Sequence, residues 1–314
     1  MFSLVGLTSS GMGISLGYNR YGKAECRLVH IDRSTPTHVI TDVTVTSQLT
    51  GDFADTHLTG DNSEVIATDT QKNTVYALAR QGGVGAPEAF GLRLARYFVD
   101  GFEQVHGSRQ EVLLHGWERI ETSVGGPHDH AFRGSTSETR TAVVVKNGVE
   151  ETVISGLSDL VVLKSTGSEF HGFPDVPHTS LVETDDRILA TAVAARWRQL
   201  GTGPDLDAVD WDASFTGVRQ ILLDTFADVH SLSLQQSLYA MGRAVLADHP
   251  EIAEIRFSMP NKHHFLVDLG KWGLDNPNEV WYAADRPYGL IEASIVRDDA
   301  PPAPGAWEGV AGFL

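Results

Sequence analysis

The chain contains the same order of segments twice: two strand-like segments, two helix-like segments and two more strand-like segments. In the first half, β-branched residues alternate with polar ones over residues 39–49, a period that predicts a strand with one solvated face. From residue 69 onward Val75, Leu78 and Ala79 recur at helical spacing, and Phe90, Leu94, Tyr97 and Phe98 do so within residues 87–102. This duplication predicts, in each half, a four-stranded antiparallel sheet with a helix pair on one face.

The predicted elements cover most of the chain. The expected strands are residues 23–31, 39–49, 111–120 and 139–146 in the first half, and 153–164, 188–198, 252–259 and 280–295 in the second. The expected helices begin at residue 69 and cover 87–102, 211–230 and 234–247. Asn147 and Gly148 form a typical tight turn, so we expect two units, residues 1–147 and 148–314, and the Pro-rich residues 298–304 predict an extended tail.

Such sheets leave one face and two edges uncovered. Exposed edge strands pair readily with another chain, and a sheet face without helices needs another cover. We therefore expect an α+β protein whose antiparallel sheets assemble, in several subunits, into a closed β-barrel.

Composition excludes several partners. Acidic residues outnumber basic ones 41 to 24, so a nucleic-acid-binding face is not expected. Cys26 is the only cysteine, which excludes an intramolecular disulfide and a multi-cysteine zinc site. No stretch reaches the ~20 apolar residues that span a membrane. Residues 1–17 do not resemble a signal peptide and residues 310–314 are not a peroxisomal signal, so we expect a cytoplasmic protein.

Two predicted helices begin with groups that could bind a ligand. Thr68 and Asp69 open the first helix, where an N-cap is the simple interpretation and an anion held by free helix amides is the functional one. Leu234 and Gln235 open the corresponding helix of the second half. A glutamine there is usually solvated, although its planar donors and acceptor also suit a flat heterocycle.

Loops of the second half hold further candidates. Phe170 and Phe173 either fill a core, or one of them offers a stacking surface to a ligand. Arg187 follows the acidic residues 183–186 and either forms a surface ion pair or offers a planar fork to an anion. Asn261 and His263 follow a Met–Pro bend at a strand end, which favours side chains aimed into a cleft.

The sequence predicts neither a bound metal nor a nucleotide cofactor. Thirteen histidines include the pairs His128 with His130 and His263 with His264, but adjacent residues of a strand point to opposite faces. No metallohydrolase spacing such as H-E-x-x-H and no Walker A sequence is present.

These motifs resemble those of the urate oxidases (uricases), especially the bacterial members. The matching stretches are residues 21–25, 67–76, 163–170 with Arg187, 261–265 and 285–291, within a resemblance that runs from about residue 18 to the C-terminus. Two positions depart from the family pattern. His178 stands where an aromatic residue is usual, and Leu234 replaces the valine of fungal relatives.

The resemblance implies two tandem tunnelling-fold (ββααββ) units and a homotetramer that encloses a tunnel, with active sites between subunits. It implies oxidation of urate by O2 and water to 5-hydroxyisourate and hydrogen peroxide, without metal or organic cofactor. Phe170 would stack on the purine, and Arg187 and Gln235 would hold opposite edges of the urate anion. Leu234 would donate its backbone N–H, and Asn261 would lie above the ring near the oxygen site.

The remaining roles implied by the resemblance concern proton transfer and the neighbouring subunit. Thr68 and Asp69 would contact the ligand from another subunit, and Lys23, Thr68 and His263 would form a proton relay. Two other functions stay open on the residues alone. One is a zinc-dependent hydrolase of pterins or purines, which the lone Cys26 disfavours, and the other is a purine sensor, which the joint presence of the relay residues disfavours.

Overall fold

The computed structural model describes residues 13–284, 286–303 and 305–310. Residues 1–12 of the N-terminal stretch, residue 285 of one matching motif, residue 304 of the tail and residues 311–314 therefore lie outside the described residues. Along the chain the elements are β1 (Tyr21–Asp32), β2 (Val39–Gly51), α1 (Ala54–Leu58), α2 (Thr68–Gly82), α3 (Pro87–Gly101), β3 (Val105–Thr122), β4 (Gly126–Asn147), β5 (Glu150–Lys164), β6 (Leu189–Gln199), α4 (Pro204–Asp207), α5 (Trp211–Asp228), α6 (Leu234–Asp248), β7 (Ile252–Asn261), β8 (His264–Leu266), the 3-10 helix η1 (Gly270–Trp272), β9 (Trp281–Ala283) and β10 (Gly289–Val296).

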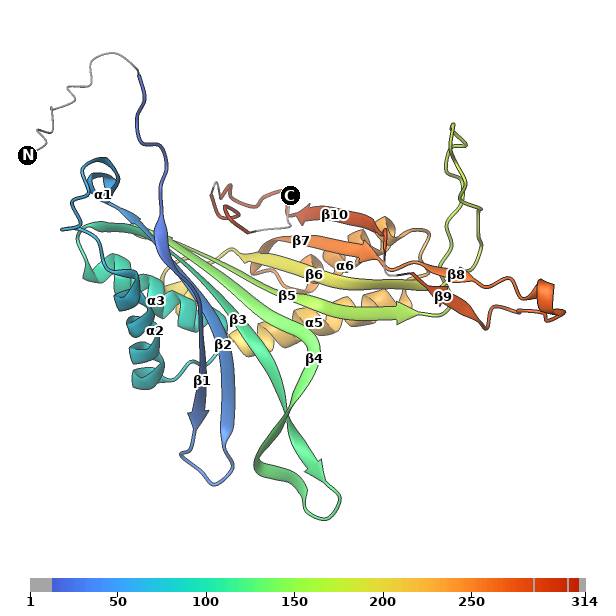
Figure 1. Cartoon of the computed structure of the whole chain (residues 1–314), viewed down its shortest axis with the longest axis horizontal. Coiled ribbons are helices and arrows are strands. Elements are labelled where there is room, and N and C mark those ends of the chain that lie inside the picture. The colour runs from blue at the N-terminus through green and yellow to red at the C-terminus, as the bar shows by residue number, and fades with distance from the viewer. Residues whose placement is uncertain (1–12, 285, 304, 311–314) are drawn as a thin grey trace, which may run out of the picture.

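One eight-stranded antiparallel sheet dominates the fold, in the order β1-β2-β3-β4-β5-β6-β7-β10 (Figure 1). The expectation of two separate four-stranded sheets is therefore wrong. The predicted turn explains the difference, because Gly148 adopts a positive φ of 55° and lets β4 pair directly with β5 from Asn147 and Glu150 onward. The division into units 1–147 and 148–314 stays a prediction.

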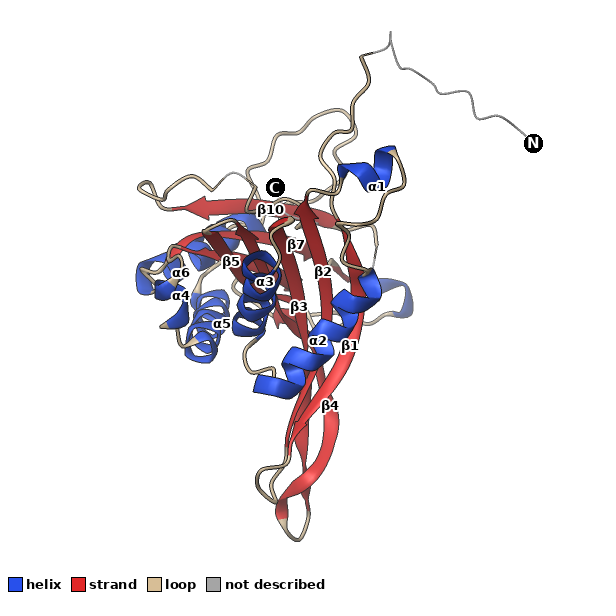
Figure 2. Cartoon of the chain, turned by 90° about the vertical axis from the view of Figure 1, so that its left-hand side faces the viewer, coloured by secondary structure: helices blue, strands red, loops and turns tan. Residues whose placement is uncertain are grey.

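The four long helices lie against one face of this sheet (Figures 1 and 2). In the first half Phe90 and Leu94 of α3 pack on Val43 and Val45 of β2. In the second half the core contains buried side chains of α5, α6, β6 and β7, among them Leu222, Leu238, Trp197 and Phe257. Tyr97 is 43% exposed, so its expected place on the buried face of its helix is wrong.

Several element boundaries differ from those predicted. The β3–β4 hairpin is much longer than expected and extends beyond the helices (Figure 1). The single strand expected over residues 280–295 is two strands, β9 and β10, and Pro287 lies between them. Proline supplies no N–H to a strand ladder, which accounts for the interruption. The short elements α1, α4, η1 and β8 carry too few residues for a periodic signal.

Ion pairs join the helix layers of the two halves. Arg140 of β4 bonds the buried carboxylate of Glu88 on α3 at 2.8 Å and the exposed carboxylate of Asp212 on α5 at 2.5 Å. Arg96 of α3 likewise bonds Glu151 at 2.7 Å and Asp207 at 2.6 Å. These contacts fix the first helix pair relative to the second half of the chain.

The face of the sheet opposite the helices is partly covered by the chain itself. Ala306 and Val310 pack on Val143 and Ile154, and the Arg256 guanidinium lies 4.0 Å from the Trp307 ring centroid. The chain itself therefore supplies part of the cover that this face was expected to need, and the barrel assembly stays a prediction. Residues 298–303 contain no helix or strand, as expected for the tail. Strands β1 and β10 are the two sheet edges in the part of the chain that is described.

Candidate active site

The loops at one end of the sheet bring three of the predicted site residues, Phe170, Arg187 and His263, to one cavity. Backbone hydrogen bonds join the loop after β5 to the segment before α6, from Glu169 N–H to Ser231 O (2.8 Å) and from Ser231 N–H to Gly167 O (2.9 Å). A third runs from the N–H of Arg187, just before β6, to Ser168 O (2.8 Å). Phe170, Arg187 and the start of α6 are therefore positioned by one backbone network.

A cavity of about 420 Å³ lies in this region and is lined by Phe170, Arg187 and His263. The Arg187 guanidinium carbon lies 5.2 Å from the centroid of the Phe170 ring, and its Nε is 3.4 Å from Ser168 Oγ. The exposed Phe265 and the half-buried Trp281 lie nearby in the β8–β9 ladder and add aromatic surface to the lining. The cavity thus combines one arginine with aromatic and aliphatic side chains, and the carboxylates of Glu183 and Asp186 also line it.

Arg187 forms no ion pair within the described ranges, so its interpretation as a surface ion pair is wrong. The acidic residues that precede it have other partners. Asp186 accepts hydrogen bonds from Thr166 Oγ1 (2.9 Å) and the Gly167 N–H (3.2 Å), and Glu183 accepts one from the Gly172 N–H (2.7 Å). Burial lowers the pKa of Arg187 from its usual value, which measures how far its charge is withdrawn from water.

Phe170 and Phe173 are both half-buried and stack on each other, with ring centroids 5.2 Å apart and an interplanar angle of 18°. The interpretation of these rings as core filling is therefore wrong. The pairing occurs in a loop without periodic structure, so no sequence pattern could have predicted it. Phe173 thus covers part of the Phe170 ring, the surface expected to stack on a ligand.

The end of β7 supplies Asn261 and His263. Asn261 pairs with Thr191 of β6 on one side and Gly289 of β10 on the other, which fixes its backbone at the cavity end of the sheet. The His263 ring stacks on Phe265, with centroids 5.8 Å apart. Burial, and then the positive charge of Arg187, lower the pKa of His263, so its imidazole is neutral at pH 7 and can accept a proton.

The first turn of α6 contains one buried and one exposed candidate residue. Leu234 is buried in the helix-side core, whereas Gln235 is exposed and has no hydrogen-bond partner in the described part of the chain. The N-cap is Ser233, whose hydroxyl accepts from the Gln236 N–H at 3.1 Å. Gln235 is therefore free for a ligand, although its surroundings also fit the simpler interpretation of a solvated glutamine.

Lys23, Thr68 and Asp69 lie elsewhere, on β1 and at the start of α2. Ala67 is the N-cap and makes no side-chain capping bond, so the N-cap role expected of Thr68 or Asp69 is wrong. The ion pair with Lys72 lowers the pKa of Asp69, and the charge of Lys23 acts in the same direction. These residues form a second, separate group.

Within one chain the two groups cannot form a single site. Strands β1 and β7 are separated by five strands of the sheet. With neighbouring strands ~4.8 Å apart, β1, which carries Lys23, and β7, which ends two residues before His263, lie roughly 29 Å from each other. Figure 1 shows the two groups of elements at opposite sides of the molecule.

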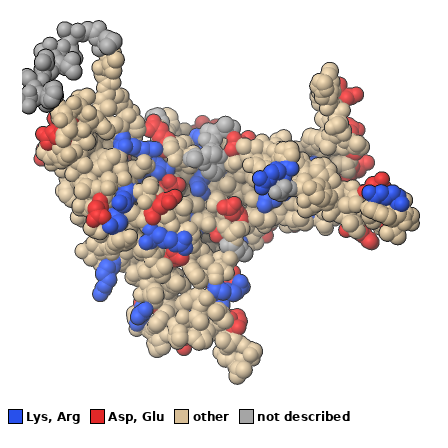
Figure 3. Space-filling model, in the orientation of Figure 1, with Lys and Arg blue, Asp and Glu red and all other residues tan. Residues whose placement is uncertain are grey.

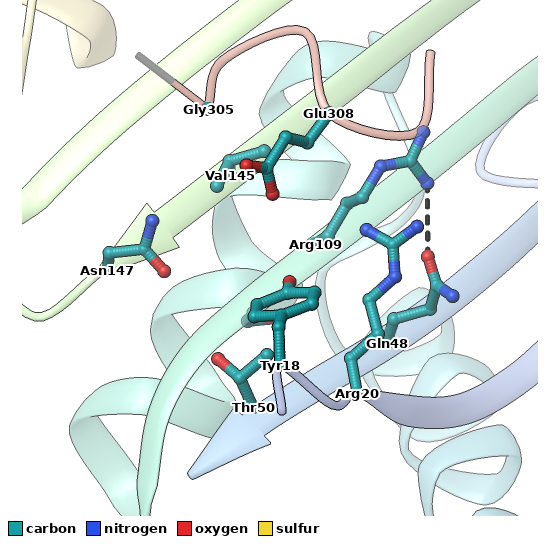
Figure 4. Close-up of a pocket in the computed structure, with 10 residues that line it drawn as sticks. Tyr18, Arg20, Gln48, Thr50, Arg109, Val145, Asn147, Gly305 and Glu308 are labelled. Atoms are coloured by element: carbon teal, nitrogen blue, oxygen red, sulfur yellow. Dashed lines mark hydrogen bonds between the residues drawn. The ribbon is translucent and has the colours of Figure 1, made fainter. Parts of the chain in front are cut away.

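A second cavity of about 320 Å³ contains none of the predicted site residues. It lies on the sheet face opposite the helices, and Figure 4 shows Arg20 and Arg109 in it together with Glu308. Arg109 donates to Gln48 Oε1 (3.3 Å), to Glu111 Oε2 (3.2 Å) and to Gly309 O (3.0 Å). Its charge already has a carboxylate partner, which distinguishes it from Arg187.

Charge is distributed evenly over the molecular face shown in Figure 3. Basic and acidic side chains are interspersed on it without a continuous basic surface. Among the described helices, none is both long and apolar enough to cross a membrane.

The fold and site define an α+β protein with an aromatic cavity suited to a planar anion. Comparison with known proteins is more specific. The sequence pattern of the uricase family matches residues 19–145 and 153–292. Uricase of Arthrobacter globiformis is 55% identical over 306 residues, which cover 98% of each chain. Uricase of Aspergillus flavus is 37% identical over 291 residues, 88% of this chain and 95% of that one.

Solved structures agree with the sequence comparison. The crystal structure of Arthrobacter globiformis uricase matches with a TM-score of 0.89 at 54% identity, over 95% of this chain and all of that one. Urate oxidase of Bacillus sp. TB-90 shares the fold, with a TM-score of 0.77 at 21% identity over 89% of this chain and all of that one. The chain belongs to the uricase family, and its resemblance to the bacterial members is confirmed.

Proposed function

We propose that this chain oxidises urate with O2 and water to 5-hydroxyisourate and hydrogen peroxide, without a metal or organic cofactor. The observation that carries the proposal is Arg187, a half-buried cation that has no carboxylate partner among the described residues and lines an aromatic cavity. A cation withdrawn from water without a counterion favours an anionic ligand. Urate is a planar anion, and family membership supports it as the substrate.

The binding roles are those that the resemblance to the urate oxidases implies for these positions, and the chemistry of each side chain is compatible with them. The Phe170 ring stacks on the purine plane, while Arg187 and Gln235 hold opposite edges of the anion as planar donors. The backbone N–H of Leu234 adds a further donor, and Asn261 lies above the ring, next to the O2 or water that reacts. Charge-assisted hydrogen bonds stabilise the deprotonated ligand, which is the form that gives up an electron to O2.

Proton transfer is assigned to Lys23, Thr68 and His263. Lys23 acts as the base of this relay. The Thr68 hydroxyl then passes a proton between Lys23 and the ligand, and the neutral imidazole of His263 accepts one.

The complete site requires two chains, because Lys23, Thr68 and Asp69 are separated from the Arg187 cavity in one chain. We infer a homotetramer in which the β1–α2 region of one subunit meets this cavity in its neighbour, and the sheets close into a barrel around a tunnel. The open edges support such assembly, since β1 exposes Val29 and Ile31 and β10 exposes Leu290.

The direct test uses purified, EDTA-treated protein and follows urate absorbance, O2 uptake and peroxide release together. The proposal predicts one O2 consumed and one peroxide formed for each urate lost. Urate binding without O2 uptake would favour the purine sensor. Activity that depends on stoichiometric zinc would favour the hydrolase, for which the buried Cys26 offers no accessible ligand.

The proton relay has a test of its own. Lys23→Ala and Thr68→Ala are expected to reduce kcat far more than they weaken binding of a urate analogue, because the relay acts on protons rather than on the purine edges. Equal losses of turnover and analogue affinity in both variants would refute the relay.

A further inference from the structure

The carboxylate beside Phe170 accepts hydrogen bonds from two imidazoles that come from different parts of the chain. Glu169 Oε2 lies 2.9 Å from His171 Nε2, and Glu169 Oε1 lies 3.1 Å from His230 Nε2. His171 belongs to the same loop after β5 as Glu169, whereas His230 lies between α5 and α6. Of these two bonds, only the one from His230 therefore joins segments that are far apart in the sequence.

The two joined segments carry groups that we assign to urate binding. Phe170 directly follows Glu169 in the first segment. In the second segment α6 begins shortly after His230, and its first residues are Leu234 and Gln235. The Glu169–His230 bond therefore connects the expected stacking surface to the expected donors at the purine edge.

Hydroxyl groups couple the residue next to His230 to α6. Ser237 Oγ donates to Ser231 Oγ at 2.7 Å, and Ser231 Oγ donates to Ser233 O at 3.0 Å. Ser231 and Ser237 are fully buried, so water does not compete for these bonds. A displacement at residue 230 is therefore transmitted to the first turn of the helix.

The backbone alone connects these segments at one point. Ser168 and Ser231 form an isolated β-bridge, with hydrogen bonds from the Glu169 N–H to Ser231 O and from the Ser231 N–H to Gly167 O. Both serines are fully buried, whereas the side chains of Glu169 and His230 are 17% and 60% exposed. The side-chain bond is thus a second attachment on the outer side of the bridge, and it opposes a rotation that a single attachment permits.

Glu169 is able to accept both bonds at once. An ionised carboxylate only accepts hydrogen bonds, so each imidazole donates its Nε2–H. The hydrogen bonds from His171 and His230 lower the pKa of Glu169, which keeps the carboxylate ionised at neutral pH. Among the described residues, no lysine or arginine forms an ion pair with it.

We propose that Glu169 and His230 are positioning residues for urate binding, and that their hydrogen bond sets the Phe170 ring relative to the Leu234 N–H and the Gln235 side chain. The inference rests on the proposed function, because one planar ligand has to meet a stacking surface and in-plane donors together. Neither Glu169 nor His230 lines the cavity, so both act through other residues. Without the bond, urate binding has to order the two segments, which raises KM and leaves kcat unchanged.

The link itself is tested by hydrogen–deuterium exchange of the full-length protein without urate, followed in residues 167–172 and 229–236. His230→Ala removes the bond between the segments. His171→Ala is the matched control, because it removes an exposed imidazole from the same carboxylate without breaking a contact between segments. Exchange of both stretches is expected to be about three- to tenfold faster in His230→Ala, the effect of one lost hydrogen bond, and to change by less than about twofold in His171→Ala. Equal exchange in the wild type and both variants would overturn the link.

The consequence for urate is tested by kcat and KM of the same three proteins. In His230→Ala, KM is expected to rise about three- to tenfold and kcat to stay within about twofold of the wild type. In His171→Ala both constants should stay near the wild-type values. Glu169→Ala should also raise KM, and the Glu169→Ala/His230→Ala double variant should raise it no further than the larger single effect, because both changes remove the same bond.

Three results would overturn the positioning role. They are an unchanged KM in His230→Ala, an equal rise of KM in His171→Ala, and a fall in kcat without a rise in KM. Failure of the proposed function is recognised separately, because it would appear as a wild-type protein that does not oxidise urate, whereas the exchange measurement needs no substrate.

Discussion

Replacing Arg187 by glutamine removes the charge that we assign to urate binding and keeps a planar polar group of similar length. A hydrogen bond to a charged group contributes about 1.5–3 kcal/mol. Because each 1.36 kcal/mol is a factor of ten, kcat/KM for urate is expected to fall by roughly 10- to 150-fold. The upper part of this range is favoured, since Arg187 is half-buried and its charge is incompletely screened by water.

The loss should arise from binding and not from unfolding. Among the described residues, the Arg187 side chain makes one hydrogen bond, at 3.4 Å to Ser168 Oγ, and lies over the Phe170 ring, so the free energy of unfolding should change by less than about 1 kcal/mol. Arg187→Lys keeps the charge but loses the planar fork, and its kcat/KM should lie between those of the glutamine variant and the wild type.

The assay is the initial rate of urate disappearance over a range of urate concentrations, with urea unfolding of each variant in parallel. Arg243→Gln is a matched control, because Arg243 is exposed on α6. A kcat/KM within threefold of the wild type for Arg187→Gln, or a loss matched by Arg243→Gln, would refute the assignment.

Three further predictions concern protonation, stability and stacking. Burial and the Arg187 charge lower the pKa of His263, so kcat/KM should fall only as the pH drops below the usual histidine pKa of ~6.5. Removing the Arg187 charge should raise the pKa of His263 and shift the acid limb of the pH–rate profile to higher pH. An acid limb that does not shift would argue against His263 as the proton acceptor. Arg140→Ala leaves the buried carboxylate of Glu88 without its ion-pair partner and should reduce the free energy of unfolding in urea by about 3–5 kcal/mol. A loss below about 1 kcal/mol would show that the Arg140–Glu88 pair does not stabilise the fold. Phe173→Ala removes the ring that stacks on Phe170 and competes with a ligand for that surface, a contact of about 0.5–1.5 kcal/mol. The Kd of a urate analogue should therefore fall by up to about tenfold. Weaker binding would mean that Phe173 orders the site.

Periodic segments of the sequence predicted the elements that carry the fold. Strand β2 and helices α3 and α6 agree with the predicted ranges to within a few residues, because their buried positions repeat at the period of the element itself. The pairing that joins both halves into one sheet cannot be predicted from the pattern of any single segment. It depends on how β4 and β5 pair across Gly148, and the alternation within each strand is the same for one sheet or two.

The candidate site, too, was predicted from the sequence only in part. The motifs around Phe170, Arg187 and His263 predicted the family and the residues that line the cavity. The stacking of Phe173 and the lack of an ion pair for Arg187 among the described residues depend on contacts between loops that have no periodic pattern. The roles of Lys23 and Thr68 stay predictions, because those residues lie apart from the cavity within one chain.

The most direct test of a site shared between two chains mixes two impaired variants, Lys23→Ala and Arg187→Gln. Each is purified alone, and equal amounts are unfolded and refolded together, with each variant refolded separately as a control. If one chain supplies Lys23 and its neighbour supplies Arg187, random assembly should restore about a quarter of the sites, and about that fraction of wild-type urate oxidation. Activity of the mixture no greater than the sum of the two variants alone would contradict a shared site.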